Sequence, residues 1–266
     1  MRLSIITINY NNKIGLKATI KSVKNQSFTN YEWIVIDGGS TDGSKNLIES
    51  CSSLFSYWVS EHDNGIYHAM NKGIAHAKGD WVLFLNSGDC LFNDNVLDDV
   101  FSDEYTEDVI YGNRAVEKDG GYEVNRYPET VSLSFFYHYS LCHQSTFYRR
   151  TLFEEALYDE SYSIAGDWAY FLDLLFKGKS FRHIDVTVAL YDNTGISSQY
   201  SEKQLREIDR VRTEKIPPHI KPDVEMLEQW RFVEHRRSLQ KLYRMFYRIL
   251  KEIDRLLTKF ESKKNG

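Results

Sequence analysis

The stretch WVLFLNSGD, residues 81–89, begins with five apolar residues and ends with four residues that are polar or glycine. The same pattern occurs in LSIITINYN at residues 3–11 and in WIVIDGGSTD at residues 33–42. Each stretch predicts a buried strand that stops at Asn or Asp residues. In an open α/β sheet, ligands bind beyond the carboxyl ends of the strands. The three strand ends therefore predict one polar site, suited to a cation or to a polyhydroxy ligand that carries phosphate.

Helices are predicted between these strands. Apolar residues recur at helical spacing over residues 14–25, 43–51 and 66–77, and Gly79 follows the last of these segments. Strands that alternate with helices are typical of βαβ units on a mostly parallel sheet. The first hundred residues are therefore expected to form an α/β layer structure.

Beyond Asp89 the pattern changes, and it predicts a second half of α+β type that packs against the first half. Residues 119–121 predict a hairpin turn, and residues 167–177 predict a helix. Residues 143–149 and 181–190 alternate like antiparallel strands. The expected fold class is α/β, with a mixed sheet flanked by helices and a C-terminal helical extension.

The composition is that of an ordinary globular protein. The chain has 266 residues, of which 42% are hydrophobic and 27% are charged. Its longest apolar run, Trp81–Leu85, is far shorter than the roughly 20 residues that span a bilayer. Strand-like sequence from Leu3 leaves no room for a signal peptide, and three scattered cysteines predict reduced thiols. We therefore expect a cytoplasmic protein.

Charge is distributed unevenly along the chain. Residues 201–266 hold 17 Lys and Arg against 11 Asp and Glu, whereas the first 200 residues hold 16 against 27. An acidic body argues against nucleic acid as a partner. A basic C-terminal segment suits an anionic surface.

The C-terminal segment predicts one long amphipathic helix over residues 230–264, after a hinge at Pro217, Pro218 and Pro222. No acidic residue stands between His235 and Lys251, so ion pairs within the helix do not account for its basic flanks. Basic flanks beside an apolar stripe are typical of a helix that lies in a membrane interface. The same spacing also suits a coiled-coil homodimer or packing on the rest of the chain. All three interpretations stay open.

Several carboxylates could carry chemistry. Asp89 directly follows the strand at 81–85, where an oxygen ligand for Mg²⁺ or Mn²⁺ is expected, although it could instead cap the helix near Asn95. Asp37 precedes two glycines and is a candidate for contacting a nucleobase or ribose, whereas Asp42 is the better candidate for a helix cap.

Asp167 stands at the start of the predicted helix 167–177, where the helix dipole favours the ionised form that a general base needs. A capping role is the alternative for this residue. His143 is expected on a strand beside the cleft, either as a ligand of the acceptor or metal, or as a structural histidine.

These segments carry a resemblance. Six segments stand in the order found in family 2 glycosyltransferases: LSIITINYN at 3–11, VIDGGSTDG at 35–43, DNGIYHAMNKG at 63–73, GDWVLFLNSGD at 79–89, HQ at 143–144 and GDW at 166–168. The chain thus resembles this family, with its GT-A fold, and in particular members that build bacterial polysaccharide or lipopolysaccharide. The resemblance covers about residues 1–200.

The resemblance implies an inverting transfer of a sugar from a nucleotide-diphospho-sugar, most simply a UDP-sugar, to a glycan or lipid-linked glycan. It implies Mn²⁺ or Mg²⁺ on Asp89, with Asp167 as the base and His143 at the acceptor or metal. Donor-binding residues would be Thr7, Asn9, Asp37, Asn71 and Ser87.

It also implies a division of the chain, with a donor half at 1–100, an acceptor half at 101–200 and the basic helical extension at 201–266. A lipid-linked acceptor would place the protein at the inner face of the plasma membrane.

Two other functions remain possible at this point. A sugar nucleotidyltransferase would share the core and the metal, but it needs a glycine-rich phosphate loop where this chain has Asn9-Tyr10-Asn11-Asn12. A non-catalytic sugar-nucleotide sensor or scaffold would not need both Asp89 and Asp167.

Overall fold

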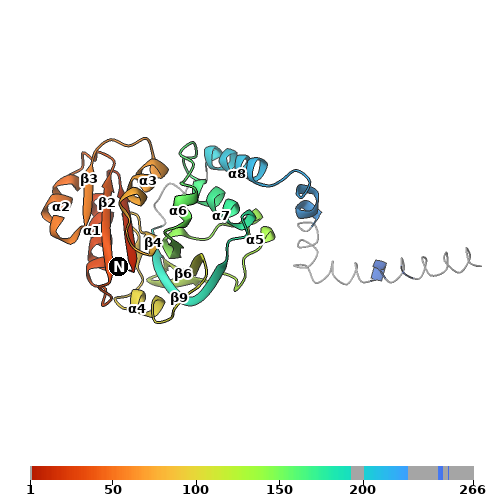
Figure 1. Ribbon diagram of the computed structural model, residues 1–266, viewed down its shortest axis with the longest axis horizontal. Coiled ribbons are helices and arrows are strands. Elements are labelled where there is room, and N and C mark those ends of the chain that lie inside the picture. The colour runs from red at the N-terminus through yellow and green to blue at the C-terminus, as the bar shows by residue number, and fades with distance from the viewer. Residues whose placement is uncertain (1, 193–200, 227–244, 248–250, 252–266) are drawn as a thin grey trace, which may run out of the picture. The chain divides into compact units, whose positions relative to one another are not determined.

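The computed structural model describes residues 2–192, 201–226, 245–247 and 251 (Figure 1). The chain divides into two compact units, Met1–Ile216 and Pro217–Gly266. The division falls at the first proline of the predicted hinge. The predicted helix over residues 230–264 lies outside the described residues except at 245–247 and 251, so it stays a prediction.

One mixed sheet runs through the described part of the first unit. Its nine strands follow the order β3-β2-β1-β4-β8-β6-β9-β5, and β7 pairs with β6 outside this path. The strands are β1 Leu3–Asn9, β2 Tyr31–Asp37, β3 Tyr57–Ser60, β4 Trp81–Phe84, β5 Cys90–Leu91, β6 Val109–Lys118, β7 Gly121–Asn125, β8 Thr146–Arg149 and β9 Phe181–Tyr191.

The helices of the first unit cover both faces of this sheet (Figure 1). They are α1 Lys13–Lys24, α2 Ser44–Ser50, α3 Ile66–His76, α4 Val96–Val100, α5 Leu133–His138, α6 Leu152–Glu155, α7 Gly166–Phe176 and α8 Glu202–Lys215, with short 3₁₀ turns η1 Ser52–Leu54 and η2 His143–Ser145. None of the helices that the structure describes combines the length and the apolar character needed to cross a bilayer.

The first four strands confirm the predicted parallel layer. β3, β2, β1 and β4 are all parallel, and Asn9 at the end of β1 is in register with Asp37 at the end of β2. Because parallel strands end at the same edge of a sheet, the polar residues that follow them are brought together. This edge carries the candidate site.

Side-chain alternation along the strands builds two cores. Ile6 and Ile34 face α3 and α7 in one core, whereas Ile5 and Trp33 face α1 and α2 in the other. Gly73 lets α3 approach β1 closely, since a Cβ atom there would lie 2.4 Å from Ile6 Cγ2. This close packing fixes the distance between α3 and β1 and so the position of α3 beside the strand ends.

The second half of the sheet corrects two predictions. β8 is antiparallel to β4 and β6, as expected, but β9 pairs parallel to β6 and is antiparallel only to β5. His143 was predicted on a strand and instead lies in η2, because the chain turns there before β8 begins. The turn directs His143 toward the strand ends.

Helix α8 belongs to the first compact unit, although the sequence placed it in the C-terminal extension beginning at residue 201. It packs against α7, and Val211 is buried. The compact unit therefore continues to Ile216, sixteen residues beyond the expected boundary at 200.

Candidate active site

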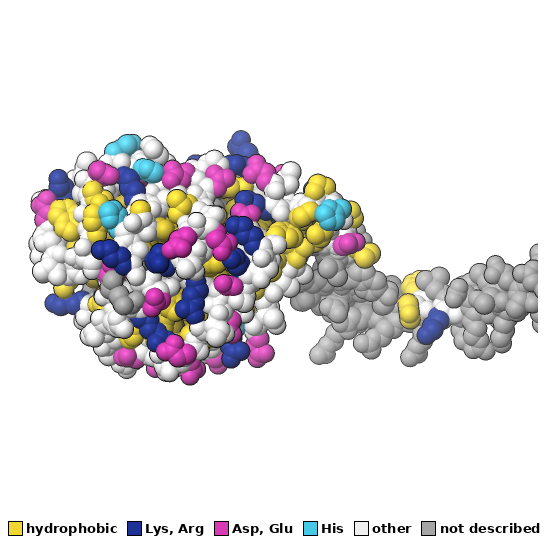
Figure 2. All heavy atoms as spheres, in the orientation of Figure 1, with side chains coloured by type: hydrophobic (Ala, Val, Ile, Leu, Met, Phe, Trp, Pro, Cys, Tyr) yellow, Lys and Arg dark blue, Asp and Glu magenta, His cyan; other side chains and the backbone are white. Residues whose placement is uncertain are grey.

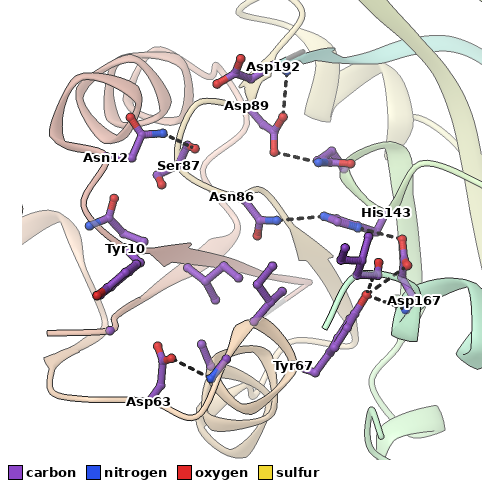
Figure 3. Close-up of a pocket in the computed structure, with 18 of the residues that line it drawn as sticks. Tyr10, Asn12, Asp63, Tyr67, Asn86, Ser87, Asp89, His143, Asp167 and Asp192 are labelled. Atoms are coloured by element: carbon purple, nitrogen blue, oxygen red, sulfur yellow. Dashed lines mark hydrogen bonds and ion pairs between the residues drawn. The ribbon is translucent and has the colours of Figure 1, made fainter. Parts of the chain in front are cut away.

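A cavity of about 710 Å³ opens at the carboxyl ends of β1, β2 and β4 (Figure 3). Its size is within the range of small-molecule sites. Polar groups converge on it from both halves of the sheet. The lining residues are Ile8, Asn9, Tyr10, Asn12, Gly38, His62, Asp63, Gly65, Ile66, Tyr67, Ala69, Asn86, Ser87, Asp89, His143, Gln144, Ile164, Asp167, Tyr191 and Asp192.

A chain of three side chains crosses one wall of the cavity (Figure 3). Asn86 Nδ2 donates to His143 Nε2 at 3.0 Å, and His143 Nδ1 lies 3.3 Å from Asp167 Oδ2. His143 thus joins Asn86 to Asp167 through its two ring nitrogens. The arrangement fixes the position of the Asp167 carboxylate on the cavity wall.

The other oxygen of Asp167 is held by the start of its own helix and by α3. Trp168 N donates to Asp167 Oδ1 at 2.9 Å, and the Tyr67 hydroxyl lies 3.2 Å from the same oxygen. The Tyr67 oxygen also accepts from Gly166 N at 2.7 Å. A Cβ atom at Gly166 would lie 2.7 Å from the Tyr67 ring, so only glycine allows this approach. Tyr67 thus ties α3 of the donor half to the helix that carries Asp167.

The buried carboxylate of Asp89 lies at another end of the cavity (Figure 3). Gln144 Nε2 donates to its Oδ2 at 2.8 Å, and Asp192 N donates to its Oδ1 at 3.1 Å. Burial raises the pKa of Asp89 to about 6, against the opposing effect of these two donors. Gly88 makes the turn with φ of 109°, and the Asp192 carboxylate passes close to it.

A cation would stabilise the charged form of Asp89. Among the described residues, no group of three or more His, Cys, Asp or Glu side chains is arranged to hold a metal ion. Two carboxylates do converge here, Asp89 and Asp192. Mg²⁺ and Mn²⁺ need only one or two protein carboxylates when substrate phosphates and water complete the shell. The residues present fit such an ion.

A carboxylate from α8 holds the loop that precedes α7. Glu207 is buried, and its two oxygens accept from the backbone N–H groups of Ser163, Ile164 and Ala165 at 2.8–3.1 Å. Burial opposes ionisation of Glu207, but these donors outweigh it and lower its pKa. Glu207 therefore fixes the backbone from which Asp167 projects.

We expect Glu207→Ala to lower the free energy of unfolding by about 2–3 kcal/mol, because one buried and two partly buried backbone N–H groups lose a charged acceptor. It should also lower turnover more than it changes affinity for the donor, since Asp167 loses its fixed position. Chemical denaturation and steady-state kinetics measure the two effects. Glu214→Gln is the matched control on the same helix, because Glu214 contacts Arg210 and Tyr162 on the surface. Equal kinetics for Glu207→Ala and the control would show that the loop before α7 keeps its conformation without Glu207.

Five of the eight residues predicted for the site line the cavity: Asn9, Ser87, Asp89, His143 and Asp167. Asn9 Oδ1 and Asn86 Oδ1 are buried and lack a hydrogen-bond partner among the described residues. Buried polar atoms are nearly always paired, so these two oxygens indicate donors supplied by a ligand.

Three predicted donor-binding residues lie outside the cavity lining. Thr7 is fully buried inside β1, where its Oγ1 accepts from Trp33 Nε1 at 3.0 Å. Asn71 is buried and bonds both backbone groups of Tyr158. In both cases the protein already uses the polar group, and the contact with a nucleotide-sugar stays a prediction.

Asp37 is the third of these residues. It is fully buried at the end of β2, and its oxygens accept from Asn9, Ser60 and twice from Ser40. Burial opposes its ionisation, but the four donors prevail and lower its pKa. In this structure Asp37 shapes the loop that carries Gly38, and its contact with a nucleoside stays a prediction.

Four site residues were missed from the sequence: Tyr67, Gln144, Asp192 and Glu207. Tyr67 and Gln144 lie within the motifs at 63–73 and 143–144 but were not predicted to line the site. Asp192 and Glu207 follow no motif. Only Asp192 had a usable signal, because it ends a predicted strand, as Asp89 does.

The sequence profile of Glycosyl transferase family 2 matches residues 4–175. That range includes Asn86, Asp89, His143 and Asp167.

The chain belongs to glycosyl transferase family 2.

This family member is 50% identical over 88 residues to an uncharacterized glycosyltransferase of Mycobacterium tuberculosis H37Rv. The match spans 33% of this chain and about a third of that protein. Over 217 residues it is 28% identical to the PGL/p-HBAD biosynthesis glycosyltransferase of Mycobacterium bovis BCG, covering 76% of this chain and 81% of that one. It is 33% identical over 199 residues to the minor teichoic acid biosynthesis protein GgaA of Bacillus subtilis 168, covering 67% and 44%.

Solved structures confirm the GT-A fold. S. aureus TarS 1–349 in complex with UDP-GlcNAc superposes with a TM-score of 0.65 at 19% identity, covering 84% of this chain and 70% of that one. The same protein with UDP gives a TM-score of 0.63 over 79% of this chain and 64% of that one. A mannosyltransferase of Pyrobaculum calidifontis, in complex with GDP-Man and Mn²⁺, gives 0.57 at 16% identity, covering 84% and 68%.

Proposed function

We propose that this protein is an inverting glycosyltransferase that moves a sugar from a nucleotide-diphospho-sugar to a hydroxyl of a glycan or lipid-linked glycan in surface polysaccharide biosynthesis. The observation that carries the proposal is the Asn86–His143–Asp167 chain on the wall of a cavity that also holds Asp89. Family membership supports the reaction class.

Asp167 acts as the general base. His143 and Tyr67 hold its two oxygens in place. Asp167 removes the proton from the acceptor hydroxyl as that oxygen attacks the anomeric carbon, and the bond to the diphosphate breaks. One base without a covalent nucleophile gives one displacement, hence inversion. Retaining enzymes with a covalent intermediate need a second carboxylate as nucleophile.

The donor would occupy the end of the cavity formed by the first strands. Tyr10 is 66% exposed and lines the cavity beside Gly38 and Asn12, where an aromatic face can stack on a nucleobase (Figure 3). Asn9 Oδ1 offers an unused acceptor nearby. The TarS structures hold UDP and UDP-GlcNAc, which supports a UDP-sugar as the donor.

Asp89 and Asp192 would hold Mn²⁺ or Mg²⁺. When bound, the ion would neutralise charge on the leaving diphosphate. The chain's own contribution is to keep the Asp89 carboxylate buried and oriented by Gln144. The mannosyltransferase crystallised with Mn²⁺ supports this cofactor.

Nucleotide release from a panel of UDP- and GDP-sugars tests the proposal. We expect sustained release with one donor and an acceptor glycan, and inverted stereochemistry at the new bond by NMR. A non-catalytic sensor would bind a donor without turnover, and a nucleotidyltransferase would release pyrophosphate from a nucleoside triphosphate and a sugar phosphate. Either result would replace the proposal.

The C-terminal extension would associate with a membrane that presents a lipid-linked acceptor. Its basic flanks and apolar stripe over residues 230–264 are the sequence basis for this. The compact unit itself mixes Lys and Arg with Asp and Glu over the face shown in Figure 2. Membrane affinity is therefore expected to come from the extension.

We expect the full-length protein to sediment with anionic liposomes at low salt and a form truncated after Pro222 to stay in the supernatant. High salt should release the full-length protein, because attraction between basic side chains and lipid is screened. Neutral liposomes are the control. If both forms stay in the supernatant with anionic lipid, the homodimer interpretation replaces this one, and the molar mass in solution then tests it.

A further inference from the structure

A second cavity of about 260 Å³ adjoins the first and shares Asp167, His143, Gln144, Ile164 and Tyr191 with it. Its remaining wall comes from β6, α7, α8 and the segment before η2. These residues are Arg114, His138, Tyr139, Ser140, Leu141, Cys142, Ala165, Trp168, Gln204, Ile208 and Arg212. The base thus stands between two compartments, and the second one lies on the acceptor half of the sheet.

Arg114 brings a charge to this wall that no side chain neutralises. Its Nε is buried without a hydrogen-bond partner, and no carboxylate of the described residues lies within ion-pair distance of it. Its guanidinium instead stacks on Tyr191, with Cζ 4.8 Å from the ring centre. The neighbouring Cys142 thiol is uncharged, because burial raises its pKa to about 11.

Arg212 adds a second cation from α8. Its Nε and Nη2 donate to the carbonyl of Tyr137 at 3.1 and 2.8 Å, and its guanidinium packs over the rings of Tyr137 and Trp168. These partners orient the side chain but carry no negative charge. The only carboxylate on the cavity wall is Asp167, among the residues that the structure describes. Two arginines therefore face one carboxylate.

A partly buried arginine without a counter-ion is costly unless a ligand supplies the charge. Guanidinium groups bind planar carboxylate and phosphate oxygens through paired hydrogen bonds. The ring of Tyr139, which is 52% exposed, suits a sugar ring.

We propose that this second cavity is an acceptor subsite that binds an anionic group of the acceptor, a phosphodiester or a carboxylate, on Arg114 and Arg212. The inference rests on the proposed function, because the acceptor hydroxyl must reach Asp167 from this side. The proposed subsite further implies that the acceptor glycan carries a negative charge.

Two matched pairs of probes test the subsite without turnover: glycerol 1-phosphate against glycerol, and glucuronate against glucose. Each is titrated into the full-length protein and followed by ligand-observed NMR. We expect the charged member of at least one pair to bind about tenfold more tightly or better, as charge-assisted hydrogen bonds require. Preference in the glycerol pair alone identifies a phosphate group, and preference in the glucose pair alone identifies a carboxylate.

Arg114→Gln should abolish the preference, and Arg114→Lys should retain part of it, because the charge survives without the planar fork. Arg126→Gln is the matched control, since Arg126 is exposed and paired with Asp185 outside both cavities. Equal binding of charged and neutral probes to the wild type would overturn the subsite. So would a preference that survives in Arg114→Gln. Nucleotide release by the same preparations shows separately whether the proposed transferase function holds.

Discussion

Replacing Asp167 with Asn is expected to lower the rate of sugar transfer about 10²- to 10⁴-fold, the usual cost of losing a general base. Asn keeps the size of the side chain and the oxygen that accepts from Trp168 N. It cannot take a proton from the acceptor hydroxyl. Affinity for the donor should change little, because the donor end of the cavity is built from other strand ends. Steady-state kinetics and calorimetric titration of the donor measure the two quantities.

The control for this substitution lies on the same helix. Asp173→Asn removes a carboxylate that lies 2.6 Å from Lys215 Nζ and does not line the cavity. It should therefore leave transfer within threefold of wild type. His143→Gln should be intermediate, since it removes the donor that orients Asp167 but not the base. Transfer by Asp167→Asn within threefold of wild type would remove this residue from the mechanism.

Asp89→Ala is expected to reduce turnover about 10²-fold or more and to weaken Mn²⁺ binding in the presence of UDP, because stabilisation of the leaving diphosphate is lost. The wild-type enzyme should lose activity in excess EDTA and regain it with Mn²⁺ or Mg²⁺. Nucleotide release as a function of metal concentration measures turnover, and water proton relaxation measures bound Mn²⁺.

Asp192→Asn separates the two carboxylates at this end of the cavity. It keeps the backbone N–H that donates to Asp89, so it should weaken metal binding less than Asp89→Ala does. Asp63→Asn changes a carboxylate on another part of the cavity wall, where it accepts from Gly65 N, and it should leave metal binding unchanged. Full activity of the wild type in excess EDTA would contradict the metal proposal.

The polar strand ends could be predicted from the sequence because they follow from local rules. Apolar runs of strand length mark buried strands, and parallel strands end at one edge. Asn9, Ser87 and Asp89 reached the cavity for this reason. Asp167 was found because a helix start next to a glycine is visible in the chain itself.

The same local rules also predicted Thr7, Asp37 and Asn71 for the donor site, but these residues lie outside the cavity lining. A polar residue near a strand end can form hydrogen bonds with other residues of the protein or with a ligand, and the sequence does not say which. In the folded chain Thr7, Asp37 and Asn71 form hydrogen bonds with Trp33, Ser40 and Tyr158, respectively. A buried polar group takes the nearest partner, and only the packing reveals that partner.

The sequence by itself determined the alternation of strands and helices, the order of the motifs and the family, because periodicity and turn residues act over a few positions. The tertiary structure decided which groups meet at Asp167. His143 approaches from a turn 24 residues away, Tyr67 from 100 residues away and Glu207 from a helix that the sequence assigned to the extension. These contacts depend on how α3, α7 and α8 pack around the sheet. Packing brings together residues that have no short-range relation along the chain, so no local pattern predicts them.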